Sequence, residues 1–174
     1  AVADPRAMSP PSVRRLPPLS SWHLAVAVFL LLVPSVSGQV TWFDSGELGA
    51  AAAGLGVPHP TGFPLLCILG YAIHLVPLGS VPFKLALLSA AAEGAATGLI
   101  HATAVARGAR PWPAALGALF FPSGAVVWLH GTVVEVYALN ACLIAWLAWL
   151  LLVPSPRWRI AALVTGLGLG AHAT

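Results

Sequence analysis

The chain has 174 residues, of which 59% are hydrophobic and only 7% are Asp, Glu, Lys or Arg, whereas about a quarter of the residues in a soluble domain are charged. Together with the mean hydropathy of +0.89, this excludes an ordinary soluble domain and favours an all-α, polytopic membrane protein. The net charge of +3 does not indicate a nucleic-acid partner, because the basic residues form short clusters between apolar runs, as topology signals do.

The N-terminal region combines a polar tail with a short apolar run. Residues 1–21 are rich in Pro, Ser and Arg and predict a disordered cytoplasmic tail. The apolar run at residues 22–37 is short for a membrane span, since about 20 residues cross a bilayer. It is either a signal peptide cleaved near residues 35–38 or a retained first helix, which the hydrophobic remainder of the chain favours. In both cases Asp44 emerges on the non-cytoplasmic side.

Five further apolar runs follow, and the first of them, residues 63–78, decides the topology. If this run crosses the membrane, four basic residues fall on each side. If it lies along the outer interface, all seven arginines are cytoplasmic and only Lys84 is outside, an asymmetry that the positive-inside rule strongly favours. The remaining runs cover residues 84–106, 113–129, 137–153 and 160–174.

The charge count therefore predicts a helical bundle of about five spans plus one juxtamembrane helix. Residues 22–174 are expected to form a partial transmembrane domain, truncated at its C-terminus because the chain ends inside an apolar, Gly-rich run. Residues 38–83 then make up the first non-cytoplasmic loop, with juxtamembrane helices. Candidate polar residues converge on the same outer face, although the charge count used none of them: Asp44, Glu47, His59, Glu135 and His172.

Asp44 and Glu47 are two carboxylates three residues apart in a chain with five acidic residues. Asp44 could simply cap a helix that begins at Ser45. Ser or Asn would cap equally well, so the second acid favours a catalytic pair. His59 lies between two prolines, which hold the chain extended or turned, although a lone histidine is more often structural than catalytic.

Two further acids lie in apolar surroundings. Glu135 would cost a few kcal/mol if it reached hydrocarbon unpaired, and an interfacial position in contact with headgroup water is equally consistent with its sequence. Glu93 falls roughly 14 Å into its helix at 1.5 Å per residue and must be protonated or paired, but the sequence assigns it no function. Cys67 and Cys142 lie within apolar runs and predict neither a disulfide nor a metal framework.

Five motifs occur in an order that is similar to a known family. The chain resembles the N-terminal part of a family of bacterial and eukaryotic multispanning membrane proteins associated with protein O-mannosyltransferase-like activity, within the GT-C superfamily of glycosyltransferases. The resemblance covers residues 38–174 and departs from the family at Thr61, where a second Pro is usual, and at Ala171, where Asn is common. The motifs are residues 42–47, 55–65, 84–90, 134–140 and 166–172.

The resemblance implies a multi-pass membrane glycosyltransferase that moves a sugar from a polyprenyl-phosphate donor to a hydroxyl of a protein or glycan acceptor. Its active face would be non-cytoplasmic, which is the periplasmic face if the protein lies in a bacterial inner membrane. Asp44 would be the general base, with Glu47 as the second catalytic residue. Groups that bind substrate, or neutralise the phosphate, would be His59, Lys84, Glu135, Tyr137 and His172. The resemblance assigns no metal ligand and no certain cofactor, although a divalent metal would suit a site with two carboxylates.

Two alternatives stay open. A transporter or channel would use Glu93 and Glu135 on a polar pathway, and its polar residues should be distributed through the depth of the membrane. The other alternative is an inactive fragment that persists as a membrane anchor.

Overall fold

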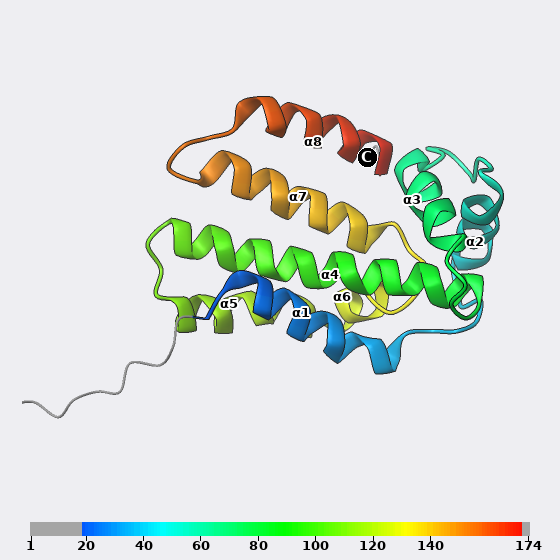
Figure 1. The fold of residues 1–174 in the computed structure, drawn as a ribbon, viewed down its shortest axis with the longest axis horizontal. Helices are drawn as coiled ribbons and strands as arrows, with labels where there is room; N and C mark the ends of the chain where they lie inside the picture. Colours follow the sequence, from blue (N-terminus) through cyan, green and yellow to red (C-terminus); the bar gives the residue numbers. More distant parts are fainter. Residues whose placement is uncertain (1–18, 172–174) are drawn as a thin grey trace, which may run out of the picture.

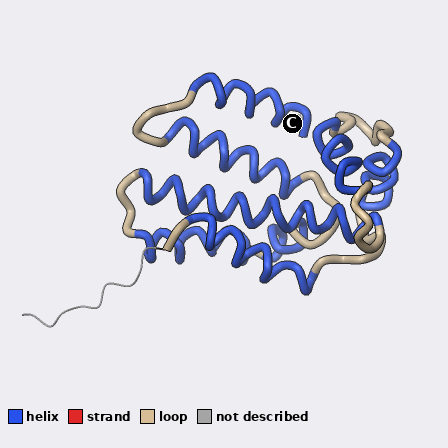
Figure 2. Tube along the Cα trace, viewed as in Figure 1, coloured by secondary structure: helices blue, strands red, loops and turns tan. Residues whose placement is uncertain are grey.

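The computed structural model describes residues 19–171, so the predicted N-terminal tail and His172 lie outside the described residues. Every regular element within residues 19–171 is helical and none is a strand, which confirms the all-α prediction (Figure 2). The elements are α1 (Ser21–Leu32), the short 3-10 turn η1 (Val33–Ser35), α2 (Ser45–Gly54), α3 (Pro64–His74), α4 (Val81–Ala106), α5 (Pro111–Ser123), α6 (Ala125–His130), α7 (Tyr137–Leu152) and α8 (Trp158–Ala171).

The helices form a bundle with a small cap at one end. Helices α1, α4, α5, α7 and α8 run side by side along the long axis, with α4 in contact with α1, α5 and α7 (Figure 1). The short helices α2 and α3 pack against each other across one end of this bundle, where α3 contacts both α4 and α8. The run at residues 63–78 thus lies across an end of the bundle and not alongside its long helices.

Helix α4 owes its central position to small residues on one side. Its first turn is capped by the Ser80 hydroxyl, which accepts a hydrogen bond from the backbone N–H of Phe83 at 3.3 Å. Farther along, a Cβ added at Gly94 would lie 2.5 Å from the carbonyl oxygen of Ala25 in α1. Glycine is therefore required for the backbones of α1 and α4 to approach this closely.

Within residues 19–171, α4 is the one helix that is both long and apolar enough to cross a membrane. Shorter apolar helices include α1, α3, α7 and α8. The expected run at residues 113–129 is not one helix, because α5 ends after Pro122 and Gly124 has an extended backbone (φ −66°, ψ 130°) before α6 begins. One candidate span is therefore observed where the sequence predicted about five.

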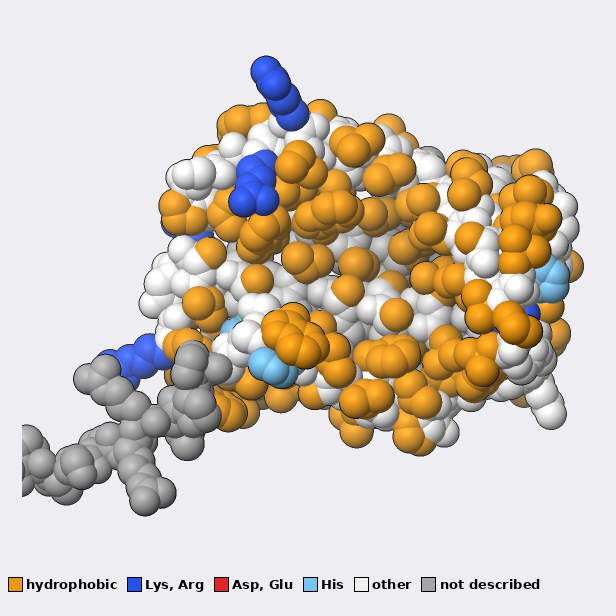
Figure 3. All heavy atoms as spheres, in the orientation of Figure 1, with side chains coloured by type: hydrophobic (Ala, Val, Ile, Leu, Met, Phe, Trp, Pro, Cys, Tyr) orange, Lys and Arg blue, Asp and Glu red, His pale blue; other side chains and the backbone are white. Residues whose placement is uncertain are grey.

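The four arginines of residues 19–171 lie at the end of the bundle opposite α2 and α3, whereas Lys84 lies at the cap (Figure 1). Arg107 and Arg110 belong to the connection between α4 and α5, and Arg157 and Arg159 to the region where α7 passes into α8. All four are exposed, and most of the Lys and Arg side chains visible in Figure 3 lie at this end. The two ends of the bundle thus differ in charge, as the topology prediction requires.

Candidate functional site

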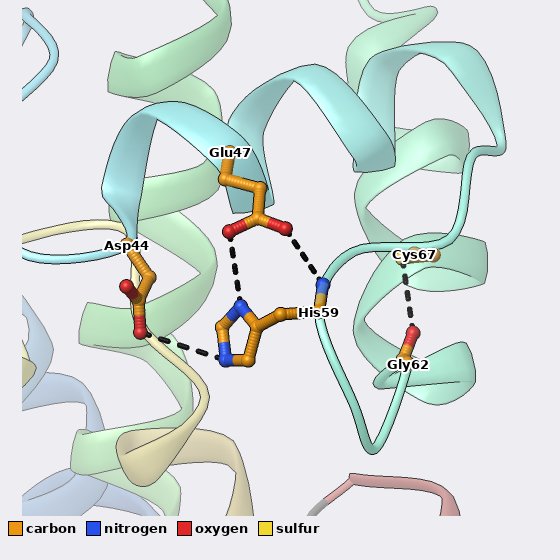
Figure 4. Close-up of polar contacts among 5 residues, drawn as sticks. All are labelled: Asp44, Glu47, His59, Gly62 and Cys67. Atoms are coloured by element: carbon orange, nitrogen blue, oxygen red, sulfur yellow. Dashed lines mark hydrogen bonds and ion pairs between the residues drawn. The ribbon is translucent and has the colours of Figure 1, made fainter.

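Asp44 stands at the start of α2, at the end of the bundle that carries the cap. Its carbonyl oxygen accepts the first helical hydrogen bond, from Leu48 N–H at 2.8 Å. Within the described residues, its carboxylate makes no capping hydrogen bond. Helix capping therefore does not account for an acid at this position, and the carboxylate points toward His59 (Figure 4).

Glu47, in the first turn of α2, holds His59 with both of its oxygens. Oε1 accepts a hydrogen bond from the backbone N–H of His59 at 2.6 Å, and Oε2 lies 3.0 Å from Nδ1 of the ring (Figure 4). The side-chain hydrogen bond is the main cause that lowers the pKa of Glu47 and raises the pKa of His59. With Nδ1 fixed in this way, Nε2 faces Asp44 Oδ2 at 3.7 Å.

The loop that carries His59 is packed against the start of α3. A turn closes behind the histidine through a hydrogen bond from Gly62 N–H to the His59 carbonyl oxygen at 2.9 Å. The buried ring of Phe63 meets the imidazole edge-on, with 5.2 Å between the ring centroids. The rigid loop expected from the two prolines is thus supported by a turn and an aromatic contact.

A cavity of about 110 Å³ opens beside these residues, and it collects side chains from distant parts of the sequence. Glu135, from the connection between α6 and α7, is only 3% exposed and lines the cavity together with Tyr137. Burial, followed by the negative charge of Asp44, raises the pKa of Glu135. The remaining lining residues are Asp44, Leu48, His59, Pro60, Thr61, Phe63 and Val136.

The structure brings together four of the candidate residues at this cavity, namely Asp44, His59, Glu135 and Tyr137, with Glu47 behind the imidazole. Thr61 also lines it, although the sequence marked this position only as a departure from the family pattern. The feature of the sequence that could have identified Thr61 is its position two residues after His59, in the same turn. His172 lies outside the described residues.

Lys84 is not among the residues that line the cavity. It is 6% exposed, and Nζ donates hydrogen bonds to the carbonyl oxygens of His74 at 2.6 Å and Val76 at 3.0 Å. These carbonyls belong to the C-terminal end of α3, where a cation is favourable. The ammonium thus binds backbone at the base of the cap, and the structure places it apart from the acids.

Asp44, Glu47 and His59 can also be considered as metal ligands, because one ligand atom from each lies within 4.8 Å of the others. A cation held by all three would compete with the hydrogen bonds between Glu47 and His59. A cation held by Asp44 and Nε2 of His59 would leave Glu47 to orient the ring from behind, as carboxylates commonly do for metal-bound histidines. The donor set of this second arrangement suits a divalent cation.

Comparison with known proteins matches this part of the chain to one family. Residues 44–174 match the family described as Protein O-mannosyl-transferase TMEM260 N-terminal domain. The chain is 33% identical over 120 residues to a Protein O-mannosyl-transferase tmem260 of Dictyostelium discoideum, covering 67% of this chain and 14% of that protein. It is 36% identical over 116 residues to Protein O-mannosyl-transferase TMEM260 of Mus musculus, covering 66% and 16%. The chain thus spans about a sixth or less of the length of these curated relatives. No solved structure matches it.

Proposed function

Since the chain belongs to the Protein O-mannosyl-transferase TMEM260 N-terminal domain family, as the order of its motifs predicted, we propose that it carries the catalytic base of a membrane O-mannosyltransferase of the GT-C type. In this proposal the enzyme transfers mannose from a polyprenyl-phosphate donor to a hydroxyl of a protein acceptor. The activity is proposed for a protein that contains this chain, because the chain spans only 14% and 16% of the two relatives described above.

The observation that carries the proposal is the Asp44 carboxylate, which makes no capping bond within the described residues and lines the cavity. Asp44 accepts the proton of the acceptor hydroxyl. The hydroxyl oxygen forms a bond to the anomeric carbon of mannose as the bond from that carbon to the phosphate oxygen breaks. The phosphate leaves with the bonding electron pair, so no separate acid is needed at the leaving group.

His59 supplies positive charge next to the base. Its pKa is raised by the hydrogen bond to Glu47 and by the charges of Glu47, Asp44 and Glu135, which favours the imidazolium form. In this proposal the imidazolium faces the departing phosphate and offsets its charge. Glu47 is a positioning residue, because it acts through the histidine. Glu135 lines the same cavity, and its raised pKa shifts it toward the protonated form; in this proposal it hydrogen-bonds a substrate oxygen.

The proposed membrane placement follows from charge and helix arrangement. We place the cap of α2 and α3 at the non-cytoplasmic face, because the four exposed arginines of the described residues lie at the other end of the bundle and the positive-inside rule assigns that end to the cytoplasm. Helices α1, α5 with α6, α7 and α8 would accompany α4 across the bilayer. In a bacterial inner membrane the cavity would then face the periplasm.

A transporter is the weaker alternative. Of the four acids in residues 19–171, Asp44 and Glu135 line the cavity and Glu47 bonds to His59 beside it, while Glu93 alone lies within the bundle. A polar pathway would distribute them along the depth of the membrane. The deciding experiment is transfer of labelled mannose from a polyprenyl-phosphate donor to an acceptor protein in membranes that contain the full-length protein. Transfer above matched membranes without the protein supports the proposal, and equal transfer in both refutes it.

A further inference from the structure

Thr61 is a polar residue of the cavity beside Asp44 that has no part in the reaction proposed above. It lines the same cavity as Asp44 and His59, and it is exposed. It lies two residues after His59, in the turn that the Gly62 N–H closes onto the His59 carbonyl oxygen. The side chain of Thr61 is thus open to a molecule that enters the cavity.

The hydroxyl of Thr61 has no hydrogen-bond partner within residues 19–171. The other threonines of these residues each donate their hydroxyl to another group of the protein. Thr41 donates to the Ser45 hydroxyl, and the rest donate to a backbone carbonyl oxygen three or four residues earlier, namely Thr97, Thr103, Thr132 and Thr165. A bond within the described protein therefore does not account for the hydroxyl at residue 61, which is left for a ligand.

The charges at the cavity direct a phosphate toward the same turn. Of the described residues that line the cavity, His59 is the one whose side chain can carry a positive charge, whereas Asp44 and Glu135 are acids. A phosphate is attracted by an imidazolium and repelled by carboxylates. Since Thr61 shares the turn of His59, a phosphate held there can accept a hydrogen bond from its hydroxyl.

We propose that Thr61 binds the donor, its hydroxyl donating a hydrogen bond to a phosphate oxygen of the polyprenyl-phosphate sugar while that phosphate faces His59. The role rests on the proposed function, because the donor phosphate is its ligand. The phosphate is charged before and after transfer, so the bond stabilises the bound donor and the transition state alike, which lowers KM and leaves kcat unchanged. Pro, the residue usual at this position in the family, has no hydroxyl, so the contact adds affinity for the donor and is not required for the reaction.

The test measures mannosyl transfer by the full-length protein that contains this chain, with the concentrations of donor and acceptor varied in turn. Thr61→Val keeps the β-branched shape and loses the hydroxyl. We expect its KM for the donor to rise about tenfold, as the loss of one hydrogen bond to a charged group produces. Its kcat and its KM for the acceptor protein should stay near those of the wild type. Thr61→Ser, which keeps the hydroxyl, should have a donor KM close to that of the wild type.

Thr165→Val on α8 is the matched control. Its hydroxyl bonds to the Ala161 carbonyl oxygen, and the residue does not line the cavity, so neither KM should change. An unchanged donor KM in Thr61→Val overturns the proposal. A rise in the acceptor KM alone also overturns it, because the hydroxyl would then contact the acceptor. Equal losses in Thr61→Val and Thr61→Ser would show that shape and not the hydroxyl matters, which again overturns it.

Binding without turnover separates this role from the proposed function. The probes are a photoreactive farnesyl phosphate and, as its match without the phosphate, a photoreactive farnesol, each crosslinked to the full-length protein in liposomes. Thr61→Val should weaken binding of the phosphate probe about tenfold and leave binding of the alcohol unchanged. Equal weakening for both probes overturns the proposal, and so does competition by inorganic phosphate as strong as that by farnesyl phosphate, which would indicate a site for free phosphate.

The two measurements fail in different ways. If mannosyl transfer is absent but Thr61→Val still weakens binding of the phosphate probe alone, the proposed function is wrong and the phosphate contact stands. If transfer is normal and wild type and Thr61→Val bind the phosphate probe equally, the role of Thr61 is wrong and the proposed function stands.

Discussion

The Glu47 carboxylate accepts two hydrogen bonds from one residue, His59, with 2.6 Å to the backbone nitrogen and 3.0 Å to Nδ1 of the ring. The two residues are twelve positions apart, so this pair fastens the loop after α2 to the first turn of that helix. Because both the backbone and the ring are held, the imidazole has little freedom to rotate. Its Nε2 consequently remains directed at Asp44 (Figure 4).

The first prediction concerns the protonation of His59. In Glu47→Gln, one half of the carboxamide donates instead of accepting, so one of the two bonds is lost and the negative charge disappears. In the wild type, the hydrogen bond to Glu47 is the main cause of the raised pKa of His59. In the variant this pKa should fall toward its ordinary value of 6.5. NMR titration of the histidine signals measures it, with Thr165→Val on α8 as a distant control. An unchanged pKa would contradict the geometry.

The second prediction is a pH window for the order of the loop. Glu47 has a lowered pKa, so its contribution is present above its ordinary value of 4.5 and is lost as pH falls through the folded value. His59 has a raised pKa, so its contribution is present below 6.5 and is lost as pH rises through the folded value. Both contributions are fully present between pH 4.5 and pH 6.5. Protection of residues 57–63 from hydrogen exchange, corrected for intrinsic rates, should therefore be greatest in this pH range. In Glu47→Gln the maximum should flatten; a maximum that persists would argue against the pair.

The third prediction separates a structural from a substrate-binding role for Lys84. Lys84→Met keeps the apolar stem but removes the donor to two carbonyl oxygens at the end of α3. A hydrogen bond to a charged group contributes about 1.5–3 kcal/mol, so thermal stability should fall, and the effect should be toward the lower value because both bonds are only part-buried. The KM for the sugar donor should remain near that of the wild type. A large rise in KM at unchanged stability would instead restore the substrate-binding role.

The fourth prediction addresses the contact between α1 and α4. Gly94→Ala introduces a Cβ 2.5 Å from the Ala25 carbonyl oxygen, so the helices must separate. Overpacking of this kind typically costs about 1–3 kcal/mol, which should appear as a lower melting temperature. Gly117→Ala is the matched control, because within the described residues no atom lies within 4 Å of its added Cβ. Equal melting temperatures for both variants would show that α1 does not pack here as described.

The sequence predicted that Asp44, Glu47 and Glu135 would lie at the end of the helical bundle opposite the arginines, but it did not predict their contacts. Arginine positions are sufficient for the first inference, because they bias whole helices to one side. The pairing of Glu47 with His59 depends on the path of the connecting loop, including left-handed backbone at Leu55 (φ 49°) and Phe63 (φ 41°). Local propensities disfavour that conformation for such residues, so tertiary packing selects it.

Two of the differences between expectation and structure have local causes. Lys84 was expected at the outer face as a group that binds substrate or neutralises the phosphate, but its ammonium donates to carbonyl oxygens at the end of a short helix. The run at residues 113–129 was expected to be continuous because hydropathy does not register backbone direction. Pro122 and Gly124 divide it into α5 and α6. That division puts His130 beside Tyr137, a neighbourhood that the apolar pattern alone does not reveal.

The last prediction is that Asp44→Asn abolishes sugar transfer while the protein still inserts and folds. Asn keeps the size of Asp and its capping ability, and within residues 19–171 the Asp44 carboxylate makes no capping bond that could be lost. A structural Asp44 would therefore tolerate the change. A general base would not, because the amide has no useful proton affinity, and losses of roughly 10²- to 10⁴-fold are expected. The assay is mannosyl transfer in membranes with expression matched by blotting.

Glu47→Gln should reduce transfer less than Asp44→Asn does, since Glu47 acts through His59. Comparable losses in both variants, together with loss of activity on chelation and its recovery with a divalent cation, would show that the site works through a metal. Near-normal transfer by Asp44→Asn would refute the assignment of the base.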